Sequence, residues 1–321
     1  MKAPRIGVTL GDPGGIGPEV VVKALSNPTL LPEAKYLIFG SAAVLDWEEH
    51  ALGVRLDRES IPIEETAESP RLAAKGAPEA GNGRASFRFF ETAVEAARAG
   101  AIQAVVTAPI SKSSWDLAGI RWRGQTEYLE HLYPGAIMTF WSERMTVALF
   151  SHHVPLREAV GRVTKENLAR FFRTVGEAME RTRRGKGEFL VAGLNPHAGE
   201  GGLLGGEEKD EIIPAIEEAR AAGMRIDGPY PPDIVFRAAA GHPEKIVVAL
   251  YHDQGLIAFK LQAFESGVNV TLGLPFVRTS PDHGTAFDIV GEKRADPRSM
   301  IEAIRLAYEL IPEKPSPGGR V

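Results

Sequence analysis

Apolar runs alternate with helical patterns along the whole chain. Seven runs predict strands, and these are Ile6–Leu10, Tyr36–Gly40, Ile102–Thr107, Met145–Ser151, Phe189–Leu194, Ile246–Tyr251 and Val268–Leu272. Several of them are continuously apolar, which is typical of strands that helices cover on both faces. The helical patterns are Gly17–Ser26, Ala85–Ala99, Lys165–Arg181, Glu208–Ala222 and Arg298–Leu310, with an irregularity expected at Pro214. The alternation predicts an α/β fold with largely parallel sheets.

The composition narrows the class of protein. A length of 321 residues allows two domains of ordinary size. The net charge of -5, without a long basic run, argues against a general nucleic-acid-binding protein. The chain contains no cysteine, which excludes disulfides and thiolate metal sites. Since no signal-peptide pattern and no apolar stretch of about 18–20 residues occurs, we expect a cytoplasmic enzyme without a membrane partner.

Three histidine positions follow predicted strands. The pair His152-His153 follows the fourth strand, His197 comes shortly after the fifth, and His252 directly follows the sixth. Binding sites of parallel α/β sheets form beyond the carboxyl ends of their strands. Neutral imidazole is a good ligand for zinc and related metals, so these histidines are candidate ligands of a catalytic metal. The alternative, which the pattern leaves open, is that each is a hydrogen-bonded loop residue.

Two further segments could bind anions. The segment 11–19, GDPGGIGPE, follows the first predicted strand and opens a helix, where backbone amides attract negative charge. Its glycine spacing differs from the Rossmann fingerprint, so it is a weak dinucleotide signal. Lys260, Asn269 and Arg278 lie at or near later strand ends, and the polar segment 279–286 resembles a loop that shapes a ligand site.

Six blocks together resemble the 4-hydroxythreonine-4-phosphate dehydrogenases of vitamin B6 biosynthesis. They are GDPGGIGPE (11–19), TAPISK (107–112), LNPHAGEGG (194–202), GPYPPD (228–233), YHDQGL (251–256) and GVNVTLGLPFVRTSPDHGTAFDI (267–289). The resemblance implies an isocitrate/isopropylmalate dehydrogenase-like fold with two α/β/α domains and an active site in the interdomain cleft. One domain would comprise residues 1–118 and 282–321, on the cofactor side. The other would comprise residues 119–281, with the metal, substrate and dimer contacts.

The resemblance also implies the reaction and its residues. The reaction would be the NAD- or NADP-dependent oxidation and decarboxylation of 4-phosphooxy-L-threonine to 3-amino-2-oxopropyl phosphate, in a homodimer with one Zn, Co or Mg ion per subunit. The implied metal ligands are His153, His197 and His252, and the implied catalytic residues are Asp233 and Lys260. The implied substrate contacts are Gln125, Thr126, Lys260, Asn269 and Arg278. The implied cofactor-binding loop contains His283, Gly284, Thr285, Ala286 and Asp288.

The sequence departs from the family pattern at one of these positions. The family's Gly-His-Thr-Glu is Gly124-Gln125-Thr126-Glu127 here. Glutamine can donate a hydrogen bond to a phosphate, but it cannot carry a positive charge. The departure therefore bears on the identity of the substrate rather than on the type of chemistry.

Three alternatives follow from these observations. A sister dehydrogenase of 4-phospho-D-threonate or 4-phospho-D-erythronate would share the fold, metal and cofactor. A phosphate acyltransferase would share the fold but would not need three histidines at strand ends. A non-enzymatic protein that binds metal or phosphate would bind ligands without producing NADH.

Overall fold

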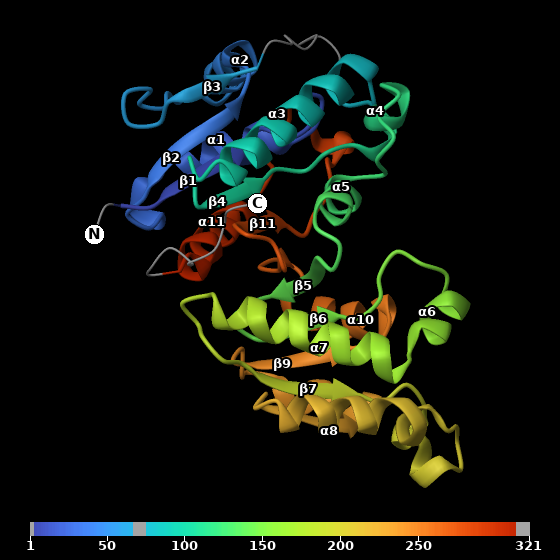
Figure 1. Ribbon diagram of the computed structural model, residues 1–321. Coiled ribbons are helices and arrows are strands. Elements are labelled where there is room, and N and C mark those ends of the chain that lie inside the picture. Colours follow the sequence, from blue (N-terminus) through green and yellow to red (C-terminus); the bar gives the residue numbers. More distant parts are fainter. Residues whose placement is uncertain (1–2, 67–74, 313–321) are drawn as a thin grey trace. The chain divides into compact units, whose positions relative to one another are not determined.

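Buried apolar residues form the strands of a mixed α/β architecture. The computed structural model describes residues 3–66 and 75–312. Within these ranges the chain forms two compact units, one from residues up to 134 together with 274–311, and one from residues 135–273. We call them unit 1 and unit 2 (Figure 1). Among the described residues, no helix combines the length and the apolar character that a membrane span requires.

Unit 1 contains a parallel sheet with the strand order β3-β2-β1-β4-β11. The strands are β1 (Arg5–Thr9), β2 (Lys35–Gly40), β3 (Ile63–Glu65), β4 (Ala104–Thr107) and β11 (Val277–Pro281). The helices are α1 (Gly17–Leu25), α2 (Ala42–Leu52), α3 (Ala80–Arg98), α4 (Lys112–Leu117), α5 (Gln125–Leu132) and α11 (Arg298–Leu310). Helix α3 packs on β1, β2 and β4, and α11 packs on β11 and β4. Two chain segments that are distant in sequence therefore share one core.

Unit 2 contains a mixed sheet with the strand order β10-β5-β6-β9-β7-β8. The strands are β5 (Ile137–Trp141), β6 (Thr146–Leu149), β7 (Glu188–Ala192), β8 (Ile226–Tyr230), β9 (Lys245–Ala249) and β10 (Val268–Leu272). The helices are α6 (Leu156–Arg162), α7 (Lys165–Glu180), α8 (Ile213–Ala221), α9 (Pro232–Ala239) and α10 (His252–Ala263). Strand β5 runs antiparallel to both β10 and β6, whereas β6, β9, β7 and β8 are parallel. Helices α7 and α8 pack together, and α9 and α10 contribute to a core with β6, β7 and β9.

The predicted elements are present with small shifts in their ends. The irregularity expected at Pro214 takes the form of a π-helical segment, Glu208–Ile212, that precedes α8. The predicted domain boundaries at 118/119 and 281/282 both fall inside unit 1. Helix α5 belongs to unit 1 because Tyr128 packs edge-to-face on Phe87 and Phe90 of α3. Strand β11 belongs there because it pairs with β4. The tail 313–321, which the predicted first domain includes, lies outside the described residues.

Candidate functional site

The three candidate metal ligands follow three neighbouring strands of unit 2. His153 follows β6, His252 begins α10 after β9, and His197 follows β7. These strands are adjacent and parallel, so their carboxyl ends meet at one sheet edge. The imidazole rings of His153 and His252 lie 5.7 Å apart between centroids. The sheet therefore brings two of the three rings together and places the third at the next strand end.

His252 has the surroundings of a metal-binding imidazole. Its Nδ1 lies 2.6 Å from a carboxylate oxygen of Asp253. A carboxylate that accepts from one ring nitrogen fixes the tautomer and leaves the other nitrogen as the electron-pair donor. Asp253 is the next residue of α10, so the sequence neighbour of His252 orients its ring.

His197 lies in a turn with an unusual backbone. His197, Ala198 and Glu200 have φ values of 52°, 51° and 44°, and His153 has a φ value of 40°. L-residues in this left-handed region each cost on the order of 1 kcal/mol or more, and such strain clusters at functional sites. Two of the three candidate ligands are therefore held in a conformation that the surrounding structure has to enforce.

The described residues of this chain do not by themselves close a metal site. Within residues 3–66 and 75–312, no group of three or more His, Asp or Glu side chains is gathered closely enough to hold an ion. The donor set nevertheless fits a metal of the zinc class, because it consists of imidazoles at one sheet edge and one of them is already oriented by a carboxylate.

The other predicted polar residues of unit 2 lie on separate elements. Asp233 is exposed on the first turn of α9, Lys260 is half-buried on α10, and Asn269 is half-buried on β10. The family resemblance assigns Asp233 to the chemistry, Lys260 to the chemistry and the substrate, and Asn269 to the substrate.

Unit 1 brings together two predicted substrate contacts, Gln125 and Arg278. Arg278 of β11 is 3% exposed, and its Nη2 donates to Oε1 of Gln125 at 2.7 Å and to Oγ1 of Thr107 at 2.8 Å. Burial lowers the pKa of the Arg278 guanidinium to about 10. Thr126 is the next residue of α5 and is half-buried. The predicted central domain included Gln125, Thr126 and Arg278, but all three lie in unit 1.

Thr107 was not predicted as a site residue. It ends β4 and is fully buried. The signal that could have identified it is a hydroxyl at a strand end within the block 107–112.

The predicted cofactor loop packs on the glycine-rich segment of unit 1. The backbone N–H of Ile16 donates to the carbonyl oxygen of Thr285 at 3.0 Å. A Cβ atom added to Gly15 would lie 2.9 Å from the Cβ of Thr285, so glycine is required for this close approach. Two segments that the sequence treated separately therefore form one structure.

The residues of this loop differ in exposure. Gly284 and Asp288 are exposed, whereas His283 and Ala286 are half-buried and Ala286 has a φ value of 40°. Nδ1 of His283 lies 3.0 Å from the carbonyl oxygen of Gly284. Its Nε2 is buried and has no hydrogen-bond partner among the described residues. A buried ring nitrogen without a partner fits a loop that binds a polar cofactor.

Asp12 shapes the glycine-rich segment from inside. Its carboxylate is fully buried and accepts from the backbone N–H of Gly14 at 2.8 Å. Burial raises the pKa of the Asp12 carboxyl above its ordinary value, an effect that nearby hydrogen bonds partly offset. Asp12 therefore acts as a local turn-forming residue.

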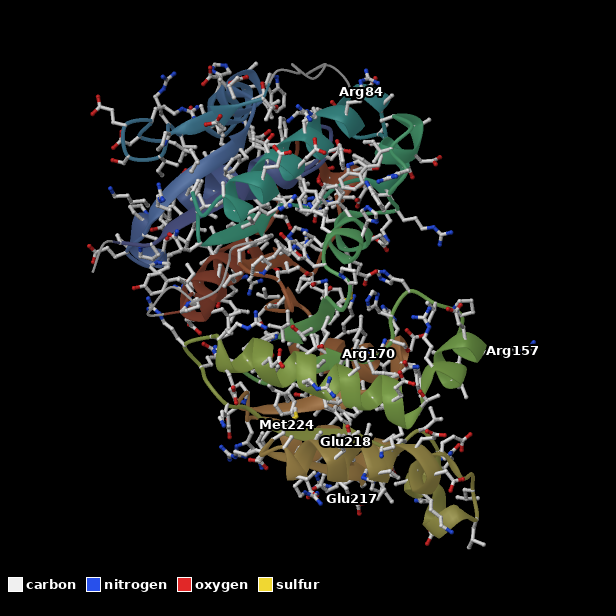
Figure 2. The ribbon with its side chains drawn as sticks, in the orientation of Figure 1. Arg84, Arg157, Arg170, Glu217, Glu218 and Met224 are labelled. Carbon is white, nitrogen blue, oxygen red and sulfur yellow. The ribbon has the colours of Figure 1, made fainter. Side chains whose placement is uncertain are left out.

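A cavity of about 340 Å³ lies elsewhere in unit 2, between α7 and α8. Phe172, Phe189 and Met224 are among its lining residues, and Glu218 contributes to it from α8. Glu218 and Met224 are labelled in Figure 2. Phe189 is the second residue of β7, so the cavity lies at the amino end of this strand, whereas His197 follows the carboxyl end. The cavity is therefore not part of the histidine edge.

Comparison with known proteins identifies the family. Residues 23–307 match the family model described as pyridoxal phosphate biosynthetic protein PdxA. A 4-hydroxythreonine-4-phosphate dehydrogenase of Desulforapulum autotrophicum is 39% identical and aligns over 95% of this chain and 94% of the relative. A relative from Oceanobacillus iheyensis, named as a D-threonate 4-phosphate dehydrogenase, is 37% identical over 98% of this chain and 99% of its own length.

Solved structures agree with the family and with the predicted fold. The crystal structure of 4-hydroxythreonine-4-phosphate dehydrogenase from Klebsiella pneumoniae is similar with a TM-score of 0.85 and 34% identity, and the match covers 97% of this chain and 99% of that one. A β-decarboxylating dehydrogenase from Thermococcus kodakarensis, at 18% identity over 95% of this chain and 83% of that one, has a TM-score of 0.52 and shares the fold. The predicted isocitrate/isopropylmalate dehydrogenase-like α/β fold is thereby confirmed. The chain belongs to the PdxA family of pyridoxal phosphate biosynthetic proteins and is a dehydrogenase.

Proposed function

We propose that this chain catalyses the NAD-dependent, metal-dependent oxidation and decarboxylation of 4-phosphooxy-L-threonine to 3-amino-2-oxopropyl phosphate. The observation that carries the proposal is the placement of His153, His252 and His197 after three adjacent parallel strands. A dehydrogenase of a small hydroxy acid needs a group that activates a hydroxyl, and imidazoles at one sheet edge provide the ligands for such a group.

The metal ligands in this proposal are His153, His197 and His252. When bound, a divalent zinc, cobalt or magnesium ion would supply Lewis-acid activation of the substrate hydroxyl. Asp253 holds the ring of His252 through the 2.6 Å contact at Nδ1, which keeps that imidazole ready to coordinate. Asp233 is the candidate proton acceptor because it is an exposed carboxylate on the first turn of α9, after β8.

The substrate contacts supply positive charge for its phosphate and carboxylate groups. Arg278 offers a planar guanidinium that Gln125 and Thr107 hold in one orientation. Lys260 and Asn269 add an ammonium and an amide from unit 2, and Thr126 adds a hydroxyl beside Gln125. A fixed anchor for the anionic ends aligns the reacting carbon with the cofactor and thereby lowers the entropic cost of reaction.

The cofactor contacts are proposed for the loop that contains His283, Gly284, Thr285, Ala286 and Asp288. The support is its packing against the glycine-rich segment at Gly15 and Ile16, together with the buried Nε2 of His283. NAD is the proposed cofactor, with NADP as the alternative that the same assay compares.

A homodimer is part of the proposal, and α10 supplies the support. Ile257, Leu261 and Phe264 are 63%, 83% and 75% exposed, and they recur with the spacing of one helix face. The opposite face buries Leu256 and Phe259 in the core of unit 2. An exposed apolar stripe on the helix that begins at His252 is typical of a surface that a second subunit covers. The interface would then help to complete the histidine site.

A second substrate class has specific support. The relative named for D-threonate 4-phosphate is 37% identical over nearly its whole length, and the relative named for 4-hydroxythreonine 4-phosphate is 39% identical. These identities do not separate the two substrates, and Gln125 differs from the histidine of the family pattern. A phosphorylated sugar acid, such as 4-phospho-D-threonate or 4-phospho-D-erythronate, is therefore the alternative. Acyl transfer is not proposed, because the family is one of dehydrogenases.

The test is an NADH assay with a panel of phosphorylated hydroxy acids, with metal content measured on the same sample. We expect turnover of 4-phosphooxy-L-threonine, loss of activity after exhaustive chelation, and recovery on addition of zinc, cobalt or magnesium. Faster turnover of a phosphorylated sugar acid would replace the substrate but keep the chemistry. Full activity after chelation, with no metal detected, would refute the metal site.

A further inference from the structure

Glu208 is a buried carboxylate beside the turn that contains His197. It is 3% exposed and belongs to the π-helical segment before α8. Its Oε1 accepts from the backbone N–H groups of Leu194 and Asn195 at 2.8 and 2.7 Å, and its Oε2 accepts from Nδ2 of Asn195 at 2.9 Å. One carboxylate therefore binds three N–H donors of the segment that leads from β7 to His197.

The glycines of this turn fit closely around the same carboxylate. A Cβ atom added to Gly199 would lie 2.6 Å from Oε2 of Glu208, and one added to Gly193 would lie 3.3 Å from Oε1. At Gly199 the backbone approaches the carboxylate more closely than a Cβ atom would allow. The positive φ values of His197, Ala198 and Glu200 belong to this wrapped turn. Three N–H donors converge on the Glu208 carboxylate, so these hydrogen bonds can offset the cost of this backbone conformation.

A second anchor joins this turn to the strand end before His252. Oε1 of Gln254 accepts from the backbone N–H of Leu250 at 2.7 Å, and Nε2 of Gln254 donates to the carbonyl oxygen of Gly193 at 2.8 Å. The Oγ of Ser151 donates to the carbonyl oxygen of Leu250 at 2.8 Å. The ends of β6, β9 and β7, each of which leads to a candidate ligand, are thus connected by hydrogen bonds.

We propose that Glu208 is a positioning residue for the metal site: it holds the 194–200 turn in the conformation that presents His197, and Gln254 fixes this turn to the strand end that presents His252. This inference rests on the proposed metal function. A carboxylate is needed because it offers two acceptor oxygens to three donors, whereas an amide offers one acceptor oxygen and would direct an NH₂ group at Asn195.

The test is a titration with Co²⁺, whose visible d–d absorption reports both affinity and ligand geometry. The variants are Glu208→Gln and, as a matched control, Glu207→Gln. Glu207 also accepts from Nδ2 of Asn195, at 2.8 Å, but it makes none of the recorded bonds to the backbone of 194–195. We expect Glu208→Gln to weaken cobalt affinity by about 10- to 100-fold and to alter the spectrum, as loss of a ligand-orienting partner does. Glu207→Gln should bind as the wild type does.

Each outcome decides one point. Cobalt binding and a spectrum equal to those of the wild type in a folded Glu208→Gln would overturn the inference and leave the proposed function intact. A wild-type chain that binds no cobalt would overturn both. Far-UV circular dichroism checks the fold of the variant. If Glu208→Gln does not fold, Gln254→Met decides instead, because it removes the second anchor without leaving a buried charge. It should weaken cobalt affinity as well, and unchanged binding would contradict the inference.

Discussion

The pair formed by Arg278 and Gln125 gives a quantitative prediction for Gln125→Leu. The guanidinium is buried, and its Nη2 donates to Gln125 and to Thr107. Leucine has nearly the volume of glutamine but accepts no hydrogen bond. A hydrogen bond to a charged group contributes about 1.5–3 kcal/mol, and its loss leaves a buried charge less solvated. We therefore expect the free energy of unfolding to fall by about 2 kcal/mol, which corresponds to roughly 4–8 °C in Tm for a unit of this size.

The assay is urea unfolding monitored by tryptophan fluorescence, since Trp115 is fully buried in the same unit. Thr107→Val removes the other acceptor of the same nitrogen, so it serves as the second arm of a double-mutant cycle. The two losses should be non-additive because both variants act on one guanidinium. A loss below about 0.5 kcal/mol for Gln125→Leu, the range of ordinary surface substitutions, would refute the reasoning. It would indicate that Arg278 is solvated by other groups.

The same position connects stability with substrate recognition. Gln125→His restores the residue of the family pattern. Its imidazole would lie next to the Arg278 guanidinium, and a neighbouring positive charge disfavours protonation of histidine. In the wild type we expect substrate affinity between pH 6 and 8 to follow only the ionisation of the substrate phosphate, because Gln125 has no proton to lose there. An identical pH profile in Gln125→His would show that the departure does not affect the pH dependence of binding.

The remaining predictions concern four other places. Asp12→Asn tests the raised pKa of this carboxyl: since the folded pKa lies above the unfolded one, the wild type is favoured at low pH and loses that advantage as pH rises. Urea titrations should therefore show that the wild type exceeds Asp12→Asn in free energy of unfolding by more at pH 4.5 than at pH 7.5. The same excess at both pH values, or a larger excess at pH 7.5, would contradict this prediction. Gly15→Ala should displace Thr285 and raise the KM for NAD in initial-rate measurements, with a smaller effect on the KM for the acid; an unchanged KM for NAD would count against the cofactor loop. Leu261→Glu should convert a dimer to a monomer in light scattering, and a monomeric wild type would dismiss the interface on α10. His197→Ala should remove nearly all activity with an unchanged circular dichroism spectrum, and appreciable residual turnover would exclude His197 as a ligand.

The sequence predicted the fold well where apolar runs are long. Val268–Leu272 and Arg298–Leu310 have the predicted bounds, because a buried strand and an amphipathic helix each leave a clear pattern. Ile226–Tyr230 and Val277–Pro281 were not predicted as strands. Their residues include Gly, Pro, Asp and Arg, and sheet pairing rather than local preference makes them extended. Ile137–Trp141 is fully buried and could have been predicted from its apolar run.

The candidate site was predictable in position more than in detail. The strand-end rule identified His197 and His252, and the family resemblance selected His153 from the pair 152–153. The contacts of Glu208 were not predictable, because they depend on how the chain folds back around a carboxylate after the turn. The hydrogen bond between Gln125 and Arg278 joins residues that are 153 positions apart, and no local pattern encodes it.

The composition of unit 1 from both chain segments has a consequence for synthesis on the ribosome. Strand β4 pairs with β1 early, but its other edge pairs with β11, which is made only after the whole of unit 2. The strands of unit 2 all lie within residues 137–272, so its sheet can form as soon as β10 emerges. During this interval the nascent chain carries the open edge of β4, where another extended segment can add. Once β11 is made, its pairing with β4 closes this edge, and the same strand contributes Arg278.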